Sequence, residues 1–262
     1  MHIIKKSVLA LFLVAVAAVS CKRQPSEDLS LDAESYKKLG MPDYNRVWTN
    51  KEYSDANITL SGLTIDYPLS LPRKNSKRSG VLFNRFISED NLLFADDGKL
   101  PLHMRAYRIQ AFETLQRRMG QIYEVETGSE GYYNDELIDL QIYRICVHEK
   151  MLELACQIMN SKEEADINLQ PGMQTVRNNF LKLMAGLLQE QQKEQEYDSR
   201  DLKKLSKKVA ASLIKNNHWF TTGDRDSLIT SINALIRESS SDYIRKNYSK
   251  ALEHIIPDKI KI

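Results

Sequence analysis

The stretch DELIDLQIYRICVHEKMLELACQIMN, residues 135–160, carries two apolar stripes at helical spacing. One stripe consists of Ile138, Ile142, Ile145, Leu152, Ala155 and Met159, and the other of Leu137, Leu140, Val147, Met151, Leu154 and Ile158. Asn134, directly before the stretch, is a favourable helix N-cap. A helix that is apolar over so much of its circumference is buried by several neighbours. We therefore expect residues 135–160 to form the central helix of the fold.

Amphipathic patterns on both sides of this stretch predict further helices. Residues 101–126 carry one apolar stripe, and they start at Pro101, a residue favoured in the first turn of a helix. Later helices are expected to begin at Pro171, at Asp198 or Ser199, at Asp224, and at Ser240 or Ser241, with Pro257 ending the last one. Shorter helices are predicted at 32–39 and 51–63.

The composition favours the same fold class. The chain of 262 residues contains 10 glycines and 7 prolines, which is few for a sheet with many turns, and no alternating run of β-branched residues competes. We predict an all-α fold: a bundle of five or six long antiparallel helices, with short N-terminal helices and an irregular loop region. Within the bundle, the segment Gln189–Glu196 is polar on all sides and is expected to project into water.

The N-terminus has the pattern of an export signal. Lys5 and Lys6 give it a positive start, and residues 8–19 form an apolar run that ends at Ser20 and Cys21. The run is too short to cross a bilayer comfortably, since a spanning helix needs about 20 apolar residues. A charged start, a short apolar core and small residues before a cleavage site together indicate a segment removed from the mature protein.

Ala18-Val19-Ser20-Cys21 resembles the lipobox of bacterial lipoproteins. The resemblance covers only residues 1–21, and it implies cleavage before Cys21 and attachment of diacylglycerol to its sulfur. More than one acyl chain anchors a protein stably to a membrane. Lipoproteins retained in the inner membrane usually carry Asp after the cysteine, whereas this chain has Lys22, so the outer membrane is the expected location. An ordinary signal peptide and an uncleaved anchor are the alternatives.

The segments then divide by composition. Residues 1–20 are the expected signal peptide, 21–50 the lipidated cysteine and tether, 51–100 an irregular segment packed on the bundle, and 101–262 the helical domain. The irregular segment contains the basic sequence RKNSKR at 73–78. This sequence is expected either to be a solvated loop or to contact anionic lipid headgroups or glycan phosphates beside the anchor.

The charge balance argues against a nucleic-acid partner. The chain has 37 basic and 35 acidic side chains, and Lys5 and Lys6 of the signal account for the difference. A nucleic-acid surface needs a strong local excess of Lys and Arg. The mature chain therefore has the composition of an ordinary globular domain.

Catalytic and metal-binding motifs are missing from the sequence. His148-Glu149 begins like the zinc motif HExxH, but the second histidine position is Leu152. No histidine has a glutamate three residues before it, as a di-iron bundle would need. Nucleophile-elbow and phosphate-loop patterns are absent too. We therefore predict no metal, no cofactor and a non-enzymatic role.

Five polar residues interrupt the expected helix–helix contacts. They are Arg108 and Glu113 on the first long helix and Arg144, His148 and Glu149 on the central one. A buried charge is costly unless it is paired. The favoured interpretation is a set of cross-helix ion pairs, Arg108 with Glu149 or Glu113 with Arg144. The alternative is a polar, ligand-binding pocket between helices.

Cysteines and aromatic residues offer fewer functional clues. Cys146 and Cys156 lie ten residues apart on one predicted helix, about 15 Å along its axis, which is too far for a disulfide. They are expected to be small core residues. Trp219 and Phe220 follow the end of a helix, where they either fill the core or form a contact for a partner.

The resulting functional hypothesis is a lipid-anchored envelope protein whose helical domain binds or assembles another envelope component. Its partners would be the membrane, through Cys21, and an envelope protein. Two alternatives stay open. One is an enzyme acting on envelope glycan or lipid through Arg144, His148 and Glu149, and the other is a carrier with a cavity between helices.

Overall fold

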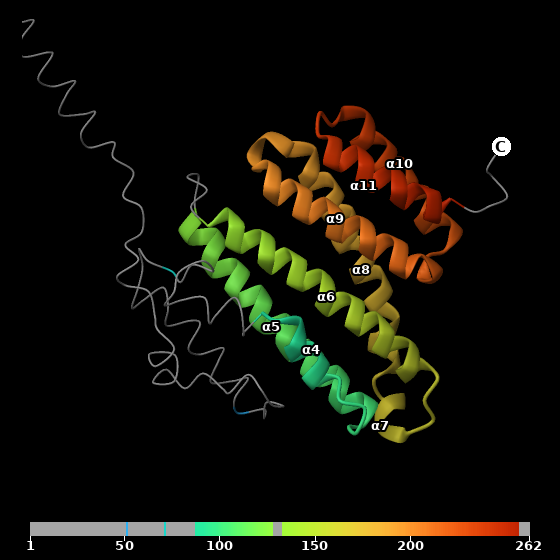
Figure 1. Cartoon of the computed structure of the whole chain (residues 1–262). Helices are drawn as coiled ribbons and strands as arrows, with labels where there is room; N and C mark the ends of the chain where they lie inside the picture. The colour runs from blue at the N-terminus through green and yellow to red at the C-terminus, as the bar shows by residue number, and fades with distance from the viewer. Residues whose placement is uncertain (1–50, 52–70, 72–86, 128–132, 257–262) are drawn as a thin grey trace, which may run out of the picture.

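The computed structural model describes residues 51, 71, 87–127 and 133–256 (Figure 1). The expected signal, the lipidated Cys21, the helix at 32–39 and the basic sequence at 73–78 lie outside the described residues. The same holds for the helix at 51–63, apart from Lys51.

The described part of the chain is all-α, as predicted, and contains no β-strand. Its elements are α4 (Glu89–Ala95), α5 (Leu102–Thr127), α6 (Asn134–Met159), α7 (Glu164–Ile167), α8 (Gln170–Glu190), the 3-10 helix η4 (Gln191–Glu196), α9 (Ser199–Asn216), the 3-10 helix η5 (Asn217–Trp219), α10 (Thr222–Glu238) and α11 (Asp242–Ile255). None of these helices is long and apolar enough to span a membrane.

Helix α6 lies at the centre, which confirms the prediction from its two apolar stripes. It packs against α5 along one side and against α8 and α9 on the other (Figure 1). Ile145, Val147, Leu154 and Ile158 are fully buried. Because α6 has apolar neighbours on several sides, each of its two stripes packs against a different neighbour and is removed from water.

Helices α9, α10 and α11 lie on the side of α6 away from α5 (Figure 1). α11 packs on α9 and on α10, and one face of each helix is apolar. Asp198 caps α9 by accepting hydrogen bonds from the backbone of Arg200 and Asp201 at 2.7 and 3.0 Å. Thr221 and Asp224 form a capping box at the start of α10, so this helix begins slightly before the predicted Asp224.

The expectation that Gln189–Glu196 projects into water holds for most of its residues, which are exposed, but it is wrong for Gln191. Gln191 is fully buried, and its amide nitrogen donates to Tyr248 Oη at 2.8 Å while that hydroxyl donates back to the amide oxygen at 3.0 Å. Glu194 accepts from the backbone nitrogen of Ser240 at 2.8 Å. A polar side chain can be buried when its donors and acceptors are satisfied, and here η4 docks on α10 and α11.

Candidate binding cleft

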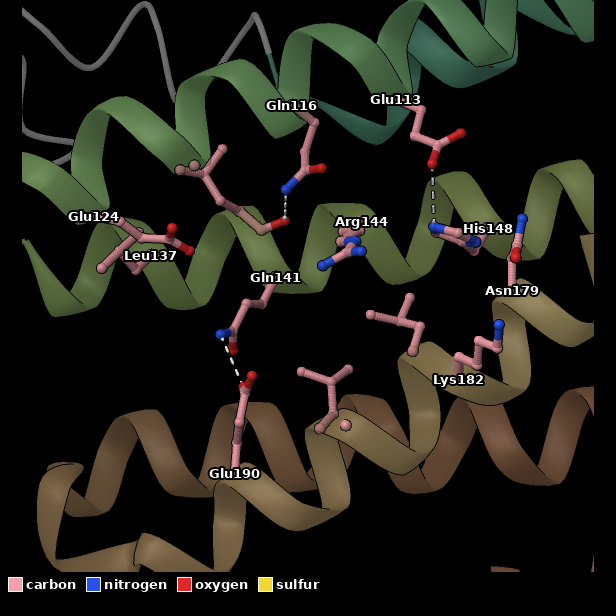
Figure 2. A pocket seen from close by; sticks show the side chains of 15 residues that line it. Glu113, Gln116, Glu124, Leu137, Gln141, Arg144, His148, Asn179, Lys182 and Glu190 are labelled. Carbon is pink, nitrogen blue, oxygen red and sulfur yellow. Dashed lines mark hydrogen bonds and ion pairs between the residues drawn. The ribbon is translucent and has the colours of Figure 1, made fainter.

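A polar cleft of about 400 Å³ opens between α5, α6 and α8 (Figure 2). α6 lies between the other two helices and supplies the middle of the lining. The lining residues are Glu113, Gln116, Gly120 and Glu124 from α5, Leu137, Leu140, Gln141, Arg144 and His148 from α6, and Asn179, Lys182, Leu183, Gly186, Leu187 and Glu190 from α8. The cleft exists because the faces of three helices that meet here carry long polar side chains around a few leucines.

Two glycines widen the cleft. Gly120 lies within α5 and Gly186 within α8, and a Cβ atom added to either would meet no atom within 4 Å. Glycine inside a helix costs about 0.5–1 kcal/mol relative to alanine. The space beside both residues is open, so packing does not explain why these two positions are glycine.

Three polar atoms lining the cleft are buried without a hydrogen-bond partner in the part of the chain that the structure describes. They are Gln116 Oε1, Gln141 Oε1 and His148 Nε2. Gln116 and His148 are only 5% and 7% exposed. Buried polar atoms are nearly always paired, so three unpaired ones around one cleft indicate a site that accepts hydrogen bonds from a ligand.

The orientation of both amides follows from their neighbours. Gln116 Nε2 donates to the backbone oxygen of Leu140 at 3.1 Å, and Gln141 Nε2 donates to Glu190 Oε2 at 3.2 Å. Rotating either amide would place its oxygen against another oxygen, which is unfavourable. Both glutamine oxygens are therefore fixed as acceptors.

His148 is held neutral. Its Nε2 lies 3.5 Å from Glu113 Oε1 without an aligned hydrogen bond. Burial, with a contribution from the nearby Arg144 guanidinium, lowers the pKa of His148 to about 4. At neutral pH the ring is a polar, uncharged group that can donate or accept one hydrogen bond at Nε2.

Charged groups are divided between the ends of the cleft. Figure 2 shows Glu124, Gln141 and Glu190 at one end and Glu113, His148, Asn179 and Lys182 at the other, with Arg144 between them. Partial burial of its carboxyl group, and the nearby Glu124, raise the pKa of Glu190, while Arg144 and Gln141 act in the opposite direction.

The two cations of the cleft, Arg144 and Lys182, are exposed, and neither forms an ion pair with a residue whose side chain is described. By contrast, Arg105 pairs with Asp96, and Lys150 pairs with Asp96 and Glu153. A guanidinium between two walls of a cleft can make bidentate hydrogen bonds to a carboxylate. This part of the cleft is suited to an anionic group.

The structure brings three of the five predicted polar residues into the cleft, namely Glu113, Arg144 and His148. The predicted ion pairs are wrong. Glu113 lies beside His148 rather than pairing with Arg144, and Arg108 Nη1 is buried without a hydrogen bond to any described residue.

Glu149 lies away from the cleft and pairs with α9. Its Oε2 is 3.5 Å from both Lys208 Nζ and Lys215 Nζ. The prediction failed because residues 148 and 149 of a helix point in directions about 100° apart. His148 therefore turns toward α5, whereas Glu149 turns toward Lys208 and Lys215 of α9.

The other lining residues were missed by the sequence analysis. Gln116, Glu124, Gln141, Lys182 and Glu190 look like the solvent face of amphipathic helices, because a long polar side chain facing a cleft and one facing bulk water give the same pattern. The available signal was the pair of glycines within predicted helices, Gly120 and Gly186, which are unfavourable there without a reason.

Trp219 and Phe220 differ in their roles. Phe220 is 4% exposed and stacks on Phe180 with the ring centroids 6.2 Å apart, so it fills the core. Trp219 lies in η5, partly buried against the same core. Of the two alternatives, the structure therefore supports core filling for Phe220.

Cys146 and Cys156 do not form a disulfide, as predicted. Cys146 Sγ donates to Glu89 Oε1 at 3.1 Å. Burial raises the pKa of this thiol to about 12, so it is not a nucleophile at neutral pH.

Among the described residues, the lining contains no serine, threonine, cysteine or tyrosine that could serve as a nucleophile. Within the described ranges, no group of three or more His, Cys, Asp or Glu residues is placed to hold a metal ion. The chemistry that the cleft offers is hydrogen bonding and charge pairing. Comparisons of the chain with protein-family models, with curated proteins and with solved structures found no match.

Proposed function

We propose that this chain is a lipid-anchored protein of the cell envelope whose helical domain binds a small polar ligand in the cleft between α5, α6 and α8 without transforming it. The observation that carries the proposal is the set of buried, unpaired polar atoms: Gln116 Oε1, Gln141 Oε1 and His148 Nε2. A buried polar atom without a partner costs about 1–3 kcal/mol, and a ligand that forms hydrogen bonds with these atoms offsets that cost.

The size of the cleft supports a small ligand. Its volume of about 400 Å³ falls within the usual range for small-molecule sites, about 300–1,000 Å³. The site is built on three long helices rather than on loops, and rigid elements hold binding groups in fixed positions.

Binding is favoured over catalysis by the state of the ionisable groups. A general acid or base works best with a pKa near the working pH, whereas burial holds the pKa of His148 at about 4. Glu149, which the enzyme hypothesis required, is paired with Lys208 and Lys215.

One observation favours a hydrolytic enzyme as the second candidate. Burial and the nearby Glu124 raise the pKa of Glu190, and two neighbouring carboxyl groups are the arrangement used to cleave glycosidic bonds. This candidate predicts that Glu190→Gln abolishes turnover of envelope glycan fragments while leaving their binding intact. Absence of turnover by the unmodified protein would eliminate it.

The envelope location rests on the lipobox resemblance at Ala18-Val19-Ser20-Cys21. Metabolic labelling with a radioactive fatty acid tests it directly. The natural chain is expected to be labelled and to fractionate with outer membranes, whereas Cys21→Ser should be unlabelled. A Cys21→Ser variant that is still labelled, or an unlabelled natural chain, would refute the anchor.

The cleft is tested by ligand-observed NMR with the mature chain and mixtures of amino acids, short peptides, sugars and nucleosides. Gly186→Phe places a ring in the open space of the cleft, and Ala185→Phe places the same ring on the neighbouring exposed position of α8. Compounds that bind the cleft should bind the natural chain and Ala185→Phe but lose most of their signal with Gly186→Phe.

Circular dichroism first checks that both variants fold like the natural chain. If they do, and no compound loses its signal selectively with Gly186→Phe, the binding proposal fails. Should Gly186→Phe fold poorly, Gly120→Leu on the opposite wall replaces it, with the exposed Gln121→Leu as its control.

A further inference from the structure

The charges of the cleft point to a particular ligand. We propose that the ligand is a zwitterionic short peptide of about three residues, lying along α6 with its ammonium group toward Glu124 and Glu190 and its carboxylate toward Arg144 and Lys182. This inference rests on the proposed function, because it names the class of molecule that the same cleft binds.

The distribution of charge supports a molecule with two opposite ends. Figure 2 places the carboxylates of Glu124 and Glu190 at one end of the cleft, Lys182 and the carboxylate of Glu113 at the other, and Arg144 between them. The first end therefore carries only negative charge, whereas Arg144 and Lys182 outnumber Glu113 toward the second. A ligand carrying only negative charge would be repelled by the acidic end, and one carrying only positive charge by the two cations. A zwitterion with charges separated along its length is attracted at both ends.

The length of the cleft matches a tripeptide. Lys182 and Glu190 are eight residues apart on α8, which corresponds to about 12 Å along the helix axis. An extended chain of three residues reaches about 10–11 Å. A single amino acid is too short to contact both ends, and a chain of five or six residues would extend beyond the lining helix turns.

The unpaired acceptors match the backbone of such a peptide. Gln116 Oε1 and Gln141 Oε1 are fixed acceptors between the charged ends, and each peptide unit presents one N–H donor. His148 Nε2 is the third buried atom without a hydrogen bond. As a neutral ring it can donate to a peptide carbonyl or to the terminal carboxylate.

The space within the cleft limits the side chains. Gly120 and Gly186 leave room on opposite walls, while Leu140, Leu183 and Leu187 supply apolar contact between the polar groups. Small or aliphatic side chains such as alanine fit this lining, because they bury apolar area without bringing an additional charge beside Arg144.

The test uses three probes that differ only at the ends: trialanine, N-acetyl-trialanine and trialanine amide. Each is titrated into the 15N-labelled mature chain, and dissociation constants are taken from chemical-shift changes. Trialanine is expected to bind, and blocking either end should weaken binding at least about tenfold.

Arg144→Gln assigns the carboxylate end. This variant should bind trialanine about as weakly as the natural chain binds trialanine amide, so that the preference for a free carboxylate disappears. Arg117→Gln is the matched control, because Arg117 is an exposed arginine of α5 that does not line the cleft. It should keep the full preference.

The outcomes separate this inference from the proposed function. Equal binding of all three probes, or binding of a sugar or nucleoside that Gly186→Phe abolishes while trialanine gives no shifts, would overturn the zwitterionic peptide and leave the cleft as a binding site. Shifts from trialanine that are unchanged in Gly186→Phe would overturn the placement in the cleft.

Discussion

At the scale of single residues, His148 shows how surroundings define chemistry. The unfolded chain protonates a histidine near the ordinary pKa of 6.5, whereas burial and Arg144 hold the folded value at about 4. Between these values the unfolded state binds more protons, so the folded state loses stability as the pH falls. The contribution of His148 is fully present above about pH 6.5 and is lost as the pH falls toward 4.

We predict that His148→Gln removes this dependence. Between pH 7 and pH 4 the natural chain should lose about 3 kcal/mol more unfolding free energy than the variant, measured by urea denaturation at each pH. His218→Gln, at an exposed position, is the control and should follow the natural chain. Parallel pH profiles of the natural chain and His148→Gln would contradict the burial argument.

Glu149 is a second residue whose partners come from a helix distant in the sequence. It is 7% exposed and contacts both Lys208 and Lys215. Glu149→Gln should lower the unfolding free energy by about 1–3 kcal/mol, because the variant loses charged hydrogen bonds in a buried setting.

Glu238→Gln provides the comparison for Glu149. Glu238 pairs with Arg237 at the surface, with side-chain exposures of 54% and 76%, and surface pairs contribute about 0–1 kcal/mol. Equal stability of the two variants in chemical denaturation would show that the Glu149 contacts do not stabilise the fold.

At the scale of elements, α8 illustrates why a cleft wall is hard to recognise. Apolar spacing predicted this helix, in which Phe180, Met184 and Leu188 are buried at 0–1% exposure. Lys182, Gly186 and Glu190 occupy another face and look like a solvent surface. Only the position of α5 across α6 turns that surface into one side of a cleft.

Gly186 offers a test at this scale. Because an added Cβ meets no atom within 4 Å, Gly186→Ala should raise the unfolding free energy by about 0.5–1 kcal/mol through helix propensity alone. The reverse change at the exposed neighbour, Ala185→Gly, should lower it by a similar amount. Destabilisation by Gly186→Ala in thermal denaturation would mean that the space beside it is not open.

In the 3-10 helix η4 the predicted exposure holds for most residues and fails at Gln191. Its sequence, QQKEQE, has no apolar residue, and hydrophobic periodicity therefore assigns it to water. Gln191 is nevertheless buried because Tyr248, 57 residues away, satisfies its amide. A long-range hydrogen-bond partner leaves no trace in local sequence.

At the scale of the whole molecule, α11 packs on both α9 and α10 and joins these two helices into one unit. Ile244, Tyr248 and Ala251 are fully buried against α9 and α10. Each large apolar side chain contributes about 1.5–3 kcal/mol when buried, and a domain is stable by only about 5–15 kcal/mol in total. The helix therefore contributes a decisive share of the stability.

We predict that ending the chain after Ser241 abolishes cooperative unfolding, observed as a broad transition in circular dichroism and poor dispersion in NMR spectra. Ending it after Ile256 keeps these buried contacts and should preserve one sharp transition. A cooperative fold without α11 would show that α4–α10 are sufficient for stability.

The sequence determined the helical class, the central position of α6, and most helix starts, because these depend on apolar spacing and on caps such as Asp198 that act over a few residues. It also indicated that Glu113, Arg144 and His148 were polar residues in a helical interface. The tertiary structure alone decided that they line a cleft and that Glu149 pairs with lysines of α9 instead. It also decided that Gln116 and Gln141 point unpaired acceptors into the cleft. The reason is physical: helix formation is governed by neighbours three or four residues away, whereas a cleft is a relation between three helices, and its lining differs from a solvent surface only in what lies opposite.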